Sequence, residues 1–151
     1  MAQARCGYND TPLASGSDML MLLGPTLMVN IGFDPNFKPV AGRVPTAAVS
    51  QVQALVDTGA KESCIDNMLA AALKLPIVDR QPVSGSNGRH IANIYEAQVH
   101  IPSLSHTIIG RFAGVELIGG GQKLAALIGR TFLQGYTMIY EGATGTVTLA
   151  S

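Results

Sequence analysis

The sequence contains few charged residues and no excess of either sign. Charged side chains make up 13% of its 151 residues, and Lys plus Arg equal Asp plus Glu. A soluble domain usually carries about 25%. Because nucleic acid and anionic lipid both attract a basic surface, the balanced charge argues against either as the main partner. The low charge, together with a hydrophobic content of 47%, predicts that a protein partner covers part of the apolar surface.

The sequence also lacks a hydrophobic run long enough to cross a membrane. Its longest apolar run near the start, Met19 to Leu23, is far shorter than the roughly 20 residues that a membrane helix needs. This run follows Asp18, and no basic leader precedes it. We therefore expect neither a secretory signal nor a membrane partner.

Cysteine and histidine are too few and too scattered to form a framework or a metal site. The two cysteines, Cys6 and Cys64, predict unpaired thiols in a reducing compartment, which favours a cytoplasmic location. Cys6 falls in a segment that we expect to be loose. His90, His100 and His106 have no Cys or His at ligand spacing, so the sequence predicts no zinc site.

The periodicity of the chain predicts an all-β domain. Residues Ile91 to Ile101 alternate between apolar and polar, which places His100 on a face that we expect to meet water. Residues Gln51 to Val56 alternate in the same way, and residues 136–140 and 146–150 predict a closing hairpin. Short strands with turn signals at regular spacing are typical of a closed, barrel-like fold.

Two short helices interrupt this pattern of strands. Residues Asn67 to Lys74 predict a helix, because Asp66 is a suitable N-cap and Pro76 ends the stretch. Residues 130–134 predict a single helical turn. Residues 1–24 are expected to form an irregular N-terminal extension, and residues 25–151 the folded domain.

The most informative segment joins an apolar run to an aspartate and a tight turn. Ala54, Leu55 and Val56 lead into Asp57-Thr58-Gly59-Ala60, so a carboxylate lies where a buried strand ends. Glycine permits the turn and lets backbone approach the carboxylate. Alone the signal is weak, since such a triplet occurs by chance in roughly one chain of this length in fifteen. An aspartate that caps its own turn is the alternative.

Three further segments accompany this turn. Together with it they resemble the retropepsin-like aspartic proteases, specifically a bacterial-type member of that family. They are Pro25-Thr26-Leu27-Met28-Val29-Asn30-Ile31-Gly32, Val83-Ser84-Gly85-Ser86-Asn87-Gly88 and Leu127-Ile128-Gly129-Arg130. In that family they correspond to an opening strand, a glycine-rich flap and an apolar-apolar-Gly strand that leads into a short helix. The resemblance covers about residues 25 to 150 and implies the closed acid-protease barrel.

The resemblance implies no metal and no cofactor, and it also implies roles for individual residues. Asp57 would be the catalytic carboxylate, Thr58 would hold the partner's copy, and Gly59 would shape the floor of the catalytic turn. Substrate-binding positions would be Ala60, Lys61, Glu62, Ser84, Gly85, Ser86, Asn87, Gly88, Leu127 and Ile128. Lys61 departs from the family, because retroviral members commonly place there an acid that pairs with the arginine. Arg130 therefore needs another partner, and Glu62 is a candidate.

Peptide hydrolysis by carboxylates alone needs two of them. One takes a proton from water while the other donates to the carbonyl oxygen, and aspartic proteases are known to share one proton within such a pair. Only Asp57, of six aspartates, is followed by Thr/Ser-Gly. One chain thus supplies half a site, and we expect a homodimer in which Asp57 meets its own copy. The expected partners are therefore a second copy and a peptide or protein substrate, hydrolysed by an aspartic endopeptidase.

Two alternatives belong to other functional classes. A non-catalytic module of the retropepsin fold could bind peptides or dimerise without turnover. A phosphate-binding turn of the actin-like kinase type would need a far longer chain and a second phosphate loop. The resemblance also raises two further expectations, namely autoprocessing within an extended apolar patch at residues 20–23, and a contribution of the closing hairpin to the dimer interface.

Overall fold

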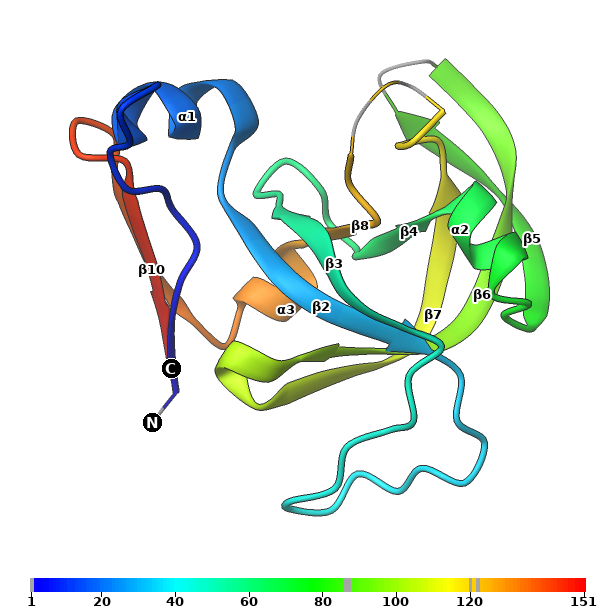
Figure 1. Cartoon of the computed structure of the whole chain (residues 1–151). Coiled ribbons are helices and arrows are strands. Elements are labelled where there is room, and N and C mark those ends of the chain that lie inside the picture. The colour runs from blue at the N-terminus through cyan, green and yellow to red at the C-terminus, as the bar shows by residue number, and fades with distance from the viewer. Residues whose placement is uncertain (1, 86–87, 120, 122) are drawn as a thin grey trace.

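The computed structural model describes residues 2–85, 88–119, 121 and 123–151 (Figure 1). Strands dominate its secondary structure. Along the chain the elements are β1 (Gln3–Arg5), α1 (Gly16–Leu23), β2 (Thr26–Gly32), β3 (Val49–Val56), β4 (Cys64–Asp66), α2 (Asn67–Ala72), β5 (Ile77–Gly85), β6 (Gly88–Ile101), the 3-10 turn η1 (Pro102–Leu104), β7 (His106–Val115), β8 (Ala126–Ile128), α3 (Arg130–Leu133), β9 (Thr137–Glu141) and β10 (Thr146–Ala150).

Six of these strands close into a barrel. In the order β2-β3-β8-β4-β7-β6 each strand pairs with the next, and β6 also pairs with β2, which closes the ring. Strand β5 pairs with β6 and extends the sheet beyond the barrel. The all-β, closed-barrel prediction is confirmed.

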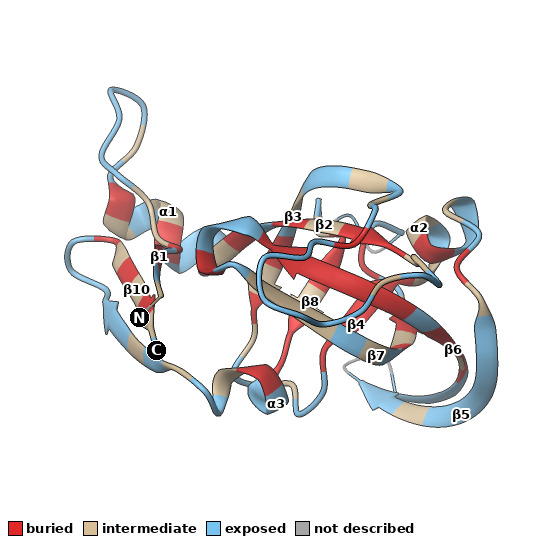
Figure 2. Ribbon diagram, turned by 90° about the horizontal axis from the view of Figure 1, so that it is seen from below, coloured by how far each residue is buried: buried red, intermediate tan, exposed pale blue. Residues whose placement is uncertain are grey.

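Alternating apolar side chains explain why β2 and β3 line the barrel. In β2, Leu27, Val29 and Ile31 are at most 3% exposed, whereas Met28 between them is 45% exposed. Ala54 and Val56 of β3 are buried in the same way. A period of two places these residues on one face of the sheet, and Figure 2 shows buried residues, in red, along the barrel strands. The predicted inward face of residues 51–56 is confirmed for Ala54 and Val56, and Val52 is half-buried.

Strand β6 alternates as predicted, and Glu96 on its polar face is exposed, but the prediction that His100 meets water is wrong. Gln98 and His100 are 6% and 8% exposed. The Gln98 amide accepts a hydrogen bond from the Asp34 N–H at 2.7 Å and donates one to the Asp34 carbonyl at 3.1 Å. His100 Nδ1 lies 2.9 Å from the Thr107 hydroxyl. Polar side chains that find such partners within the protein can be buried without an unpaired group.

Both predicted helices are present, with shorter ends. Helix α2 ends at Ala72 instead of Lys74, because Lys74 adopts φ +55° in the left-handed region, which a helix cannot accommodate. Helix α3 ends at Leu133, and Gln134 is its C-cap. Asp66 caps α2 as predicted, since its Oδ2 accepts a hydrogen bond from the Leu69 N–H at 2.9 Å.

Asp66 also fixes the loop that follows β7. Its Oδ1 accepts hydrogen bonds from the N–H groups of Leu117 at 3.0 Å and Ile118 at 2.9 Å, and the residue is 1% exposed. One buried carboxylate thus satisfies backbone donors from two separate segments. This contact joins the start of α2 to the loop between β7 and β8.

We expect Asp66→Ala to lower the free energy of unfolding by about 3 kcal/mol, because three backbone N–H groups lose their acceptor. Asp66→Asn retains one acceptor oxygen and should lose about half as much. Urea denaturation measures both, with Asp18→Ala on the exposed side of α1 as the control. Equal stability of Asp66→Ala and Asp18→Ala would contradict this role.

The N-terminal segment is part of the fold, so the prediction of an irregular extension is wrong for residues 3–5 and 16–23. Strand β1 pairs with β10, which pairs with β9 in the predicted closing hairpin, now confirmed. Helix α1 is capped by Ser15, whose hydroxyl accepts a hydrogen bond from the Asp18 N–H at 3.0 Å. Leu20 is 1% exposed, so the patch expected to be extended is helical and partly buried, and its cleavage would require α1 to unfold.

Close backbone contact explains this packing. A Cβ on Gly145, which has φ +82°, would collide with the backbone of Gly16, so glycine at position 145 lets the hairpin turn touch the start of α1. Cys6 is 2% exposed and not in a loose tail, and burial raises the pKa of its thiol to about 11. The small sheet and the barrel share one apolar core.

Candidate active site

Asp57 directly follows β3 at one end of the barrel. Its N–H donates a hydrogen bond to the Ile128 carbonyl at 2.9 Å, which continues the parallel pairing between β3 and β8. The backbone of Asp57 is therefore fixed to the second segment that the sequence singled out. Asp57 is half-buried, whereas Thr58 and Gly59 are exposed.

The turn after Asp57 is closed by the aspartate itself. The Gly59 N–H donates to Asp57 Oδ1 at 2.8 Å, and the Ala60 N–H donates to the Asp57 carbonyl at 3.2 Å. A Cβ on Gly59 would lie 3.1 Å from Oδ1, so a side chain there would crowd the carboxylate. This bond uses one carboxylate oxygen and orients the group at the open end of the barrel.

The segment around Gly129 supports this turn from beneath. A Cβ on Gly129 would lie 2.6 Å from the carbonyl carbon and oxygen of Glu62, so only glycine allows this approach. The Arg130 N–H donates to the Ala60 carbonyl at 2.9 Å, and the Thr131 N–H donates to the Lys61 carbonyl at 3.0 Å. The segment therefore passes directly against the aspartate turn.

Two side chains complete the support. The Arg130 guanidinium donates a hydrogen bond from Nη1 to the Thr58 carbonyl at 2.7 Å. The sequence suggested Glu62 as the partner of Arg130 and gave no indication of Thr58. Ser63, 7% exposed, accepts a hydrogen bond from the Gly129 N–H at 3.0 Å. Sequence reasoning missed Ser63, because a serine next to a loop gives no signal of its own. Both contacts hold the loop of residues 57–63 to the start of α3.

Cys64 lies buried close to the carboxylate. Its thiol is 8% exposed, and burial raises its pKa to about 12, with a further contribution from the negative charge of Asp57. The thiol therefore stays protonated at neutral pH, so Cys64 is an uncharged neighbour of the aspartate.

The glycine-rich segment forms the tip of a hairpin. Strands β5 and β6 pair from Ile77 to Gly85, where Gly85 lies opposite Gly88. Figure 1 shows this tip and the loop after β3 at the same end of the barrel. Ser84, Gly85 and Gly88 are exposed. The predicted positions Ser86 and Asn87 lie outside the described residues.

The other predicted substrate-binding positions differ in how far their side chains are exposed. Lys61 and Glu62 are exposed beside the turn, and Leu127 is half-buried. Ile128 is 1% exposed and packs in the core, because β8 is only three residues long and alternates inward at Ala126 and Ile128. The prediction that Ile128 lines a subsite is therefore wrong for the single chain.

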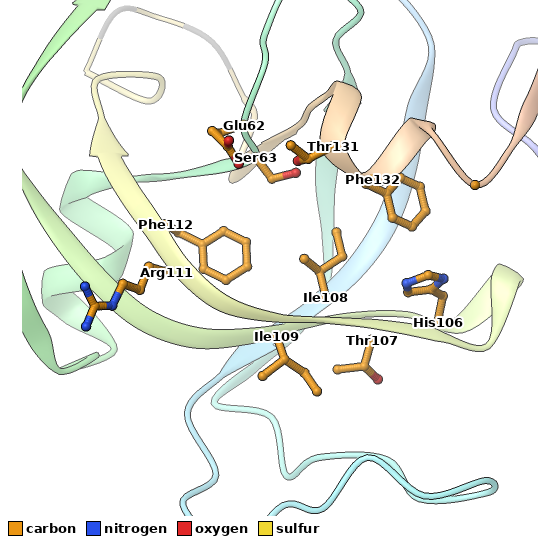
Figure 3. Close-up of a pocket in the computed structure, with 11 residues that line it drawn as sticks. Glu62, Ser63, His106, Thr107, Ile108, Ile109, Arg111, Phe112, Thr131 and Phe132 are labelled. Atoms are coloured by element: carbon orange, nitrogen blue, oxygen red, sulfur yellow. The ribbon is translucent and has the colours of Figure 1, made fainter.

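A separate pocket lies between β7 and α3. Its volume is about 550 Å³, and its lining includes Ser63, Ile108, Phe112 and Phe132. Figure 3 shows Ile108 and Phe112 directed into this space. Asp57 is not among the described residues that line it. The aspartate turn thus lies outside this pocket.

The histidines near this pocket make stability depend on pH. Burial lowers the pKa of His100, and burial together with the nearby His100 lowers that of His106. Because the unfolded chain then binds protons more readily, stability is present above the unfolded value of about 6.5 and is lost as the pH falls through the folded pKa values. We expect the free energy of unfolding to decrease from about pH 7.5 to about pH 5. Urea denaturation should show a smaller decrease in the variant His100→Gln/His106→Gln, and an equal decrease would contradict this assignment.

Comparisons with known proteins give a likeness among solved structures. No family model matches the sequence, and no curated protein matches it. Among solved structures the chain is similar to the EIAV protease complexed with the inhibitor HBY-793. The likeness has a TM-score of 0.48 and 18% sequence identity, and covers 74% of this chain and 86% of that chain. A likeness of this size carries no argument about activity or assembly, so the proposal below depends on the residues of the chain itself.

Neither a bilayer-spanning helix nor a cluster of metal ligands occurs within the described residues. No helix there has the length and apolar character needed to span a bilayer. Within the same residues, no group of three or more His, Cys, Asp or Glu side chains is arranged to hold a metal ion.

Proposed function

We propose that this chain is an aspartic endopeptidase that works as a homodimer. The observation that carries the proposal is the geometry of Asp57, a partly exposed carboxylate at the end of a barrel strand, oriented by Gly59 and fixed through its backbone to Ile128. A turn aspartate with no further role would not need the additional layer that Gly129, Arg130 and Ser63 form around the same loop.

The proposed chemistry needs the Asp57 of two chains. With the two carboxyl groups about 3 Å apart, only one ionises, as is known for aspartic proteases. The ionised carboxylate takes a proton from water, and the protonated one donates to the carbonyl oxygen of the scissile peptide. The activity should follow a bell-shaped pH profile, because neither the doubly protonated nor the doubly ionised pair can perform both steps.

The open position of the turn fits this requirement. Thr58 and Gly59 are exposed in the single chain, so a second copy can approach the carboxylate. We propose that Thr58 contacts the partner's turn and that the β5–β6 tip at Ser84, Gly85 and Gly88 covers an extended substrate peptide. The peptide would bind as an added strand, with side chains alternating between pockets. The β9–β10 hairpin is a further proposed part of the interface.

The second candidate is a peptide-binding or dimerisation module without turnover. The rim of Leu127, Lys61 and Glu62 beside the turn would serve a bound peptide equally well in either case. The two candidates differ only in whether Asp57 activates water. They share the proposed cytoplasmic location.

A diverse peptide library separates the two candidates. Wild-type protein should cleave a subset of peptides, a statine-type inhibitor should block the cleavage, and Asp57→Ala should be inactive. Binding by both forms without cleavage by either would favour the module. Cleavage that persists in Asp57→Ala would refute the proposed mechanism.

A further inference from the structure

We infer that the exposed end of helix α1 forms part of the surface through which two copies of this chain pair. The inference rests on the homodimer proposed above and assigns to it a contact that the family resemblance does not supply. The residues concerned are Met21, Leu22 and Leu23, here called the α1 patch.

The α1 patch is three consecutive large apolar side chains in contact with water. Met21 and Leu22 are each 69% exposed and Leu23 is 52% exposed, whereas Leu20 beside them is 1% exposed. Leu20 packs in the apolar core and attaches this end of α1 to it. Single exposed apolar residues are common on protein surfaces, but a contiguous apolar group is typical of an interaction site.

The α1 patch lies beside the aspartate turn. Gly24, with φ +73°, ends the helix, and a Cβ there would lie 2.8 Å from Leu55 Cδ1. The Val56 N–H donates to the Pro25 carbonyl at 2.8 Å. The helix end is therefore packed against the last two residues of β3, which immediately precede Asp57. Figure 1 shows α1 and the loop after β3 at the same end of the molecule.

The position of the α1 patch favours a second copy of this chain as the partner that covers it. If two Asp57 carboxyl groups meet on a twofold axis, exposed residues next to that turn lie close to the partner. The residues directly after the α1 patch contact Leu55 and Val56, which directly precede Asp57, so the patch adjoins the proposed interface. The chain has no net charge, so two copies do not repel one another.

The test compares two methionines that differ in position alone. Met21 on α1 and Met68 on α2 are 69% and 64% exposed, and both lie on helices. We expect Met21→Lys to raise the dissociation constant of the dimer by at least about tenfold, because a charge must then be buried in the interface. Leu22→Lys should have the same effect, and Met68→Lys should leave the constant unchanged. Sedimentation velocity over a dilution series measures the constant, and thermal unfolding confirms that each variant is folded.

Activity measured in parallel distinguishes this inference from the proposed function. At protein concentrations high enough to restore the dimer, Met21→Lys should regain wild-type kcat per dimer. If wild type forms a dimer and Met21→Lys has the same dissociation constant, the α1 patch has no role in the interface, although the homodimer remains. An equal rise of the dissociation constant in Met21→Lys and Met68→Lys leads to the same conclusion. A raised KM with an unchanged dissociation constant overturns the role of the α1 patch too, and assigns the patch to the substrate cleft. Wild-type protein that stays monomeric at micromolar concentration overturns the homodimer and this inference together.

Discussion

Asp57→Asn is expected to reduce kcat/KM on a cleavable peptide by about a thousandfold or more. The amide cannot take a proton from water, yet its oxygen can still accept the hydrogen bond from the Gly59 N–H that closes the turn. The fold and the dimer should therefore remain, which sedimentation and thermal unfolding would show. Loss of activity with an intact dimer would assign the defect to proton transfer and not to folding.

Mixing this variant with wild-type protein tests whether the acid is shared between chains. If subunits exchange at random and each active site needs two Asp57 residues, activity per wild-type chain falls in proportion to the wild-type fraction. A ninefold excess of Asp57→Asn should then leave about one tenth of the original activity per wild-type chain. The mixture must first be held at a dilution that allows exchange.

A monomeric enzyme gives the opposite result. Its activity per wild-type chain would be the same at every mixing ratio, because the variant chain would never enter a wild-type site. An equal excess of the Met68→Lys variant, which retains Asp57, serves as the control and should not inhibit. Unchanged activity in the Asp57→Asn mixture after demonstrated exchange would contradict the shared pair.

Gly129→Ala is expected to lower the free energy of unfolding by about 3 kcal/mol. The new Cβ would lie 2.6 Å from backbone atoms of Glu62 and 2.9 Å from the Lys61 carbonyl oxygen. Backbone cannot rotate away as a side chain would, so the loop of residues 57–63 or the start of α3 must move. Because that movement displaces the aspartate turn, peptidase activity should fall as well.

Gly135→Ala is the matched control. It lies just beyond α3, and a Cβ there would be 3.9 Å from the nearest atom, the Phe132 carbonyl oxygen. Its free energy of unfolding should stay within about 0.5 kcal/mol of wild type. Urea denaturation measures both variants, and an equal effect of the two substitutions would show that close packing at Gly129 is not the cause.

Much of the barrel could be predicted from the sequence because its signals are local. Alternation over residues 91–101 and 51–56 reports one buried face of each strand. The helix after Asp66 follows from a cap, an alanine run and a proline within eleven residues. These features depend on neighbours along the chain and need no knowledge of the tertiary fold.

The errors arise where distant segments meet. Polar composition predicted an irregular start, but β1 gains its partner from β10 at the other end of the chain. His100 was expected in water because alternation does not reveal that Thr107 supplies a partner. Likewise the aspartate turn could be recognised in the sequence, but its attachment through Arg130 to the Thr58 carbonyl depends on tertiary approach.

Strand β6 has two distinct environments along one continuous backbone. From Ile94 to Ile101 it is paired with β7 within the barrel, whereas its first residues are paired with β5 in the hairpin beyond it. The hairpin therefore projects from the barrel, and its base is paired on both sides. If a peptide binds beneath the tip as proposed, we expect the hairpin to bend near Ile94, where the pairing with β7 begins.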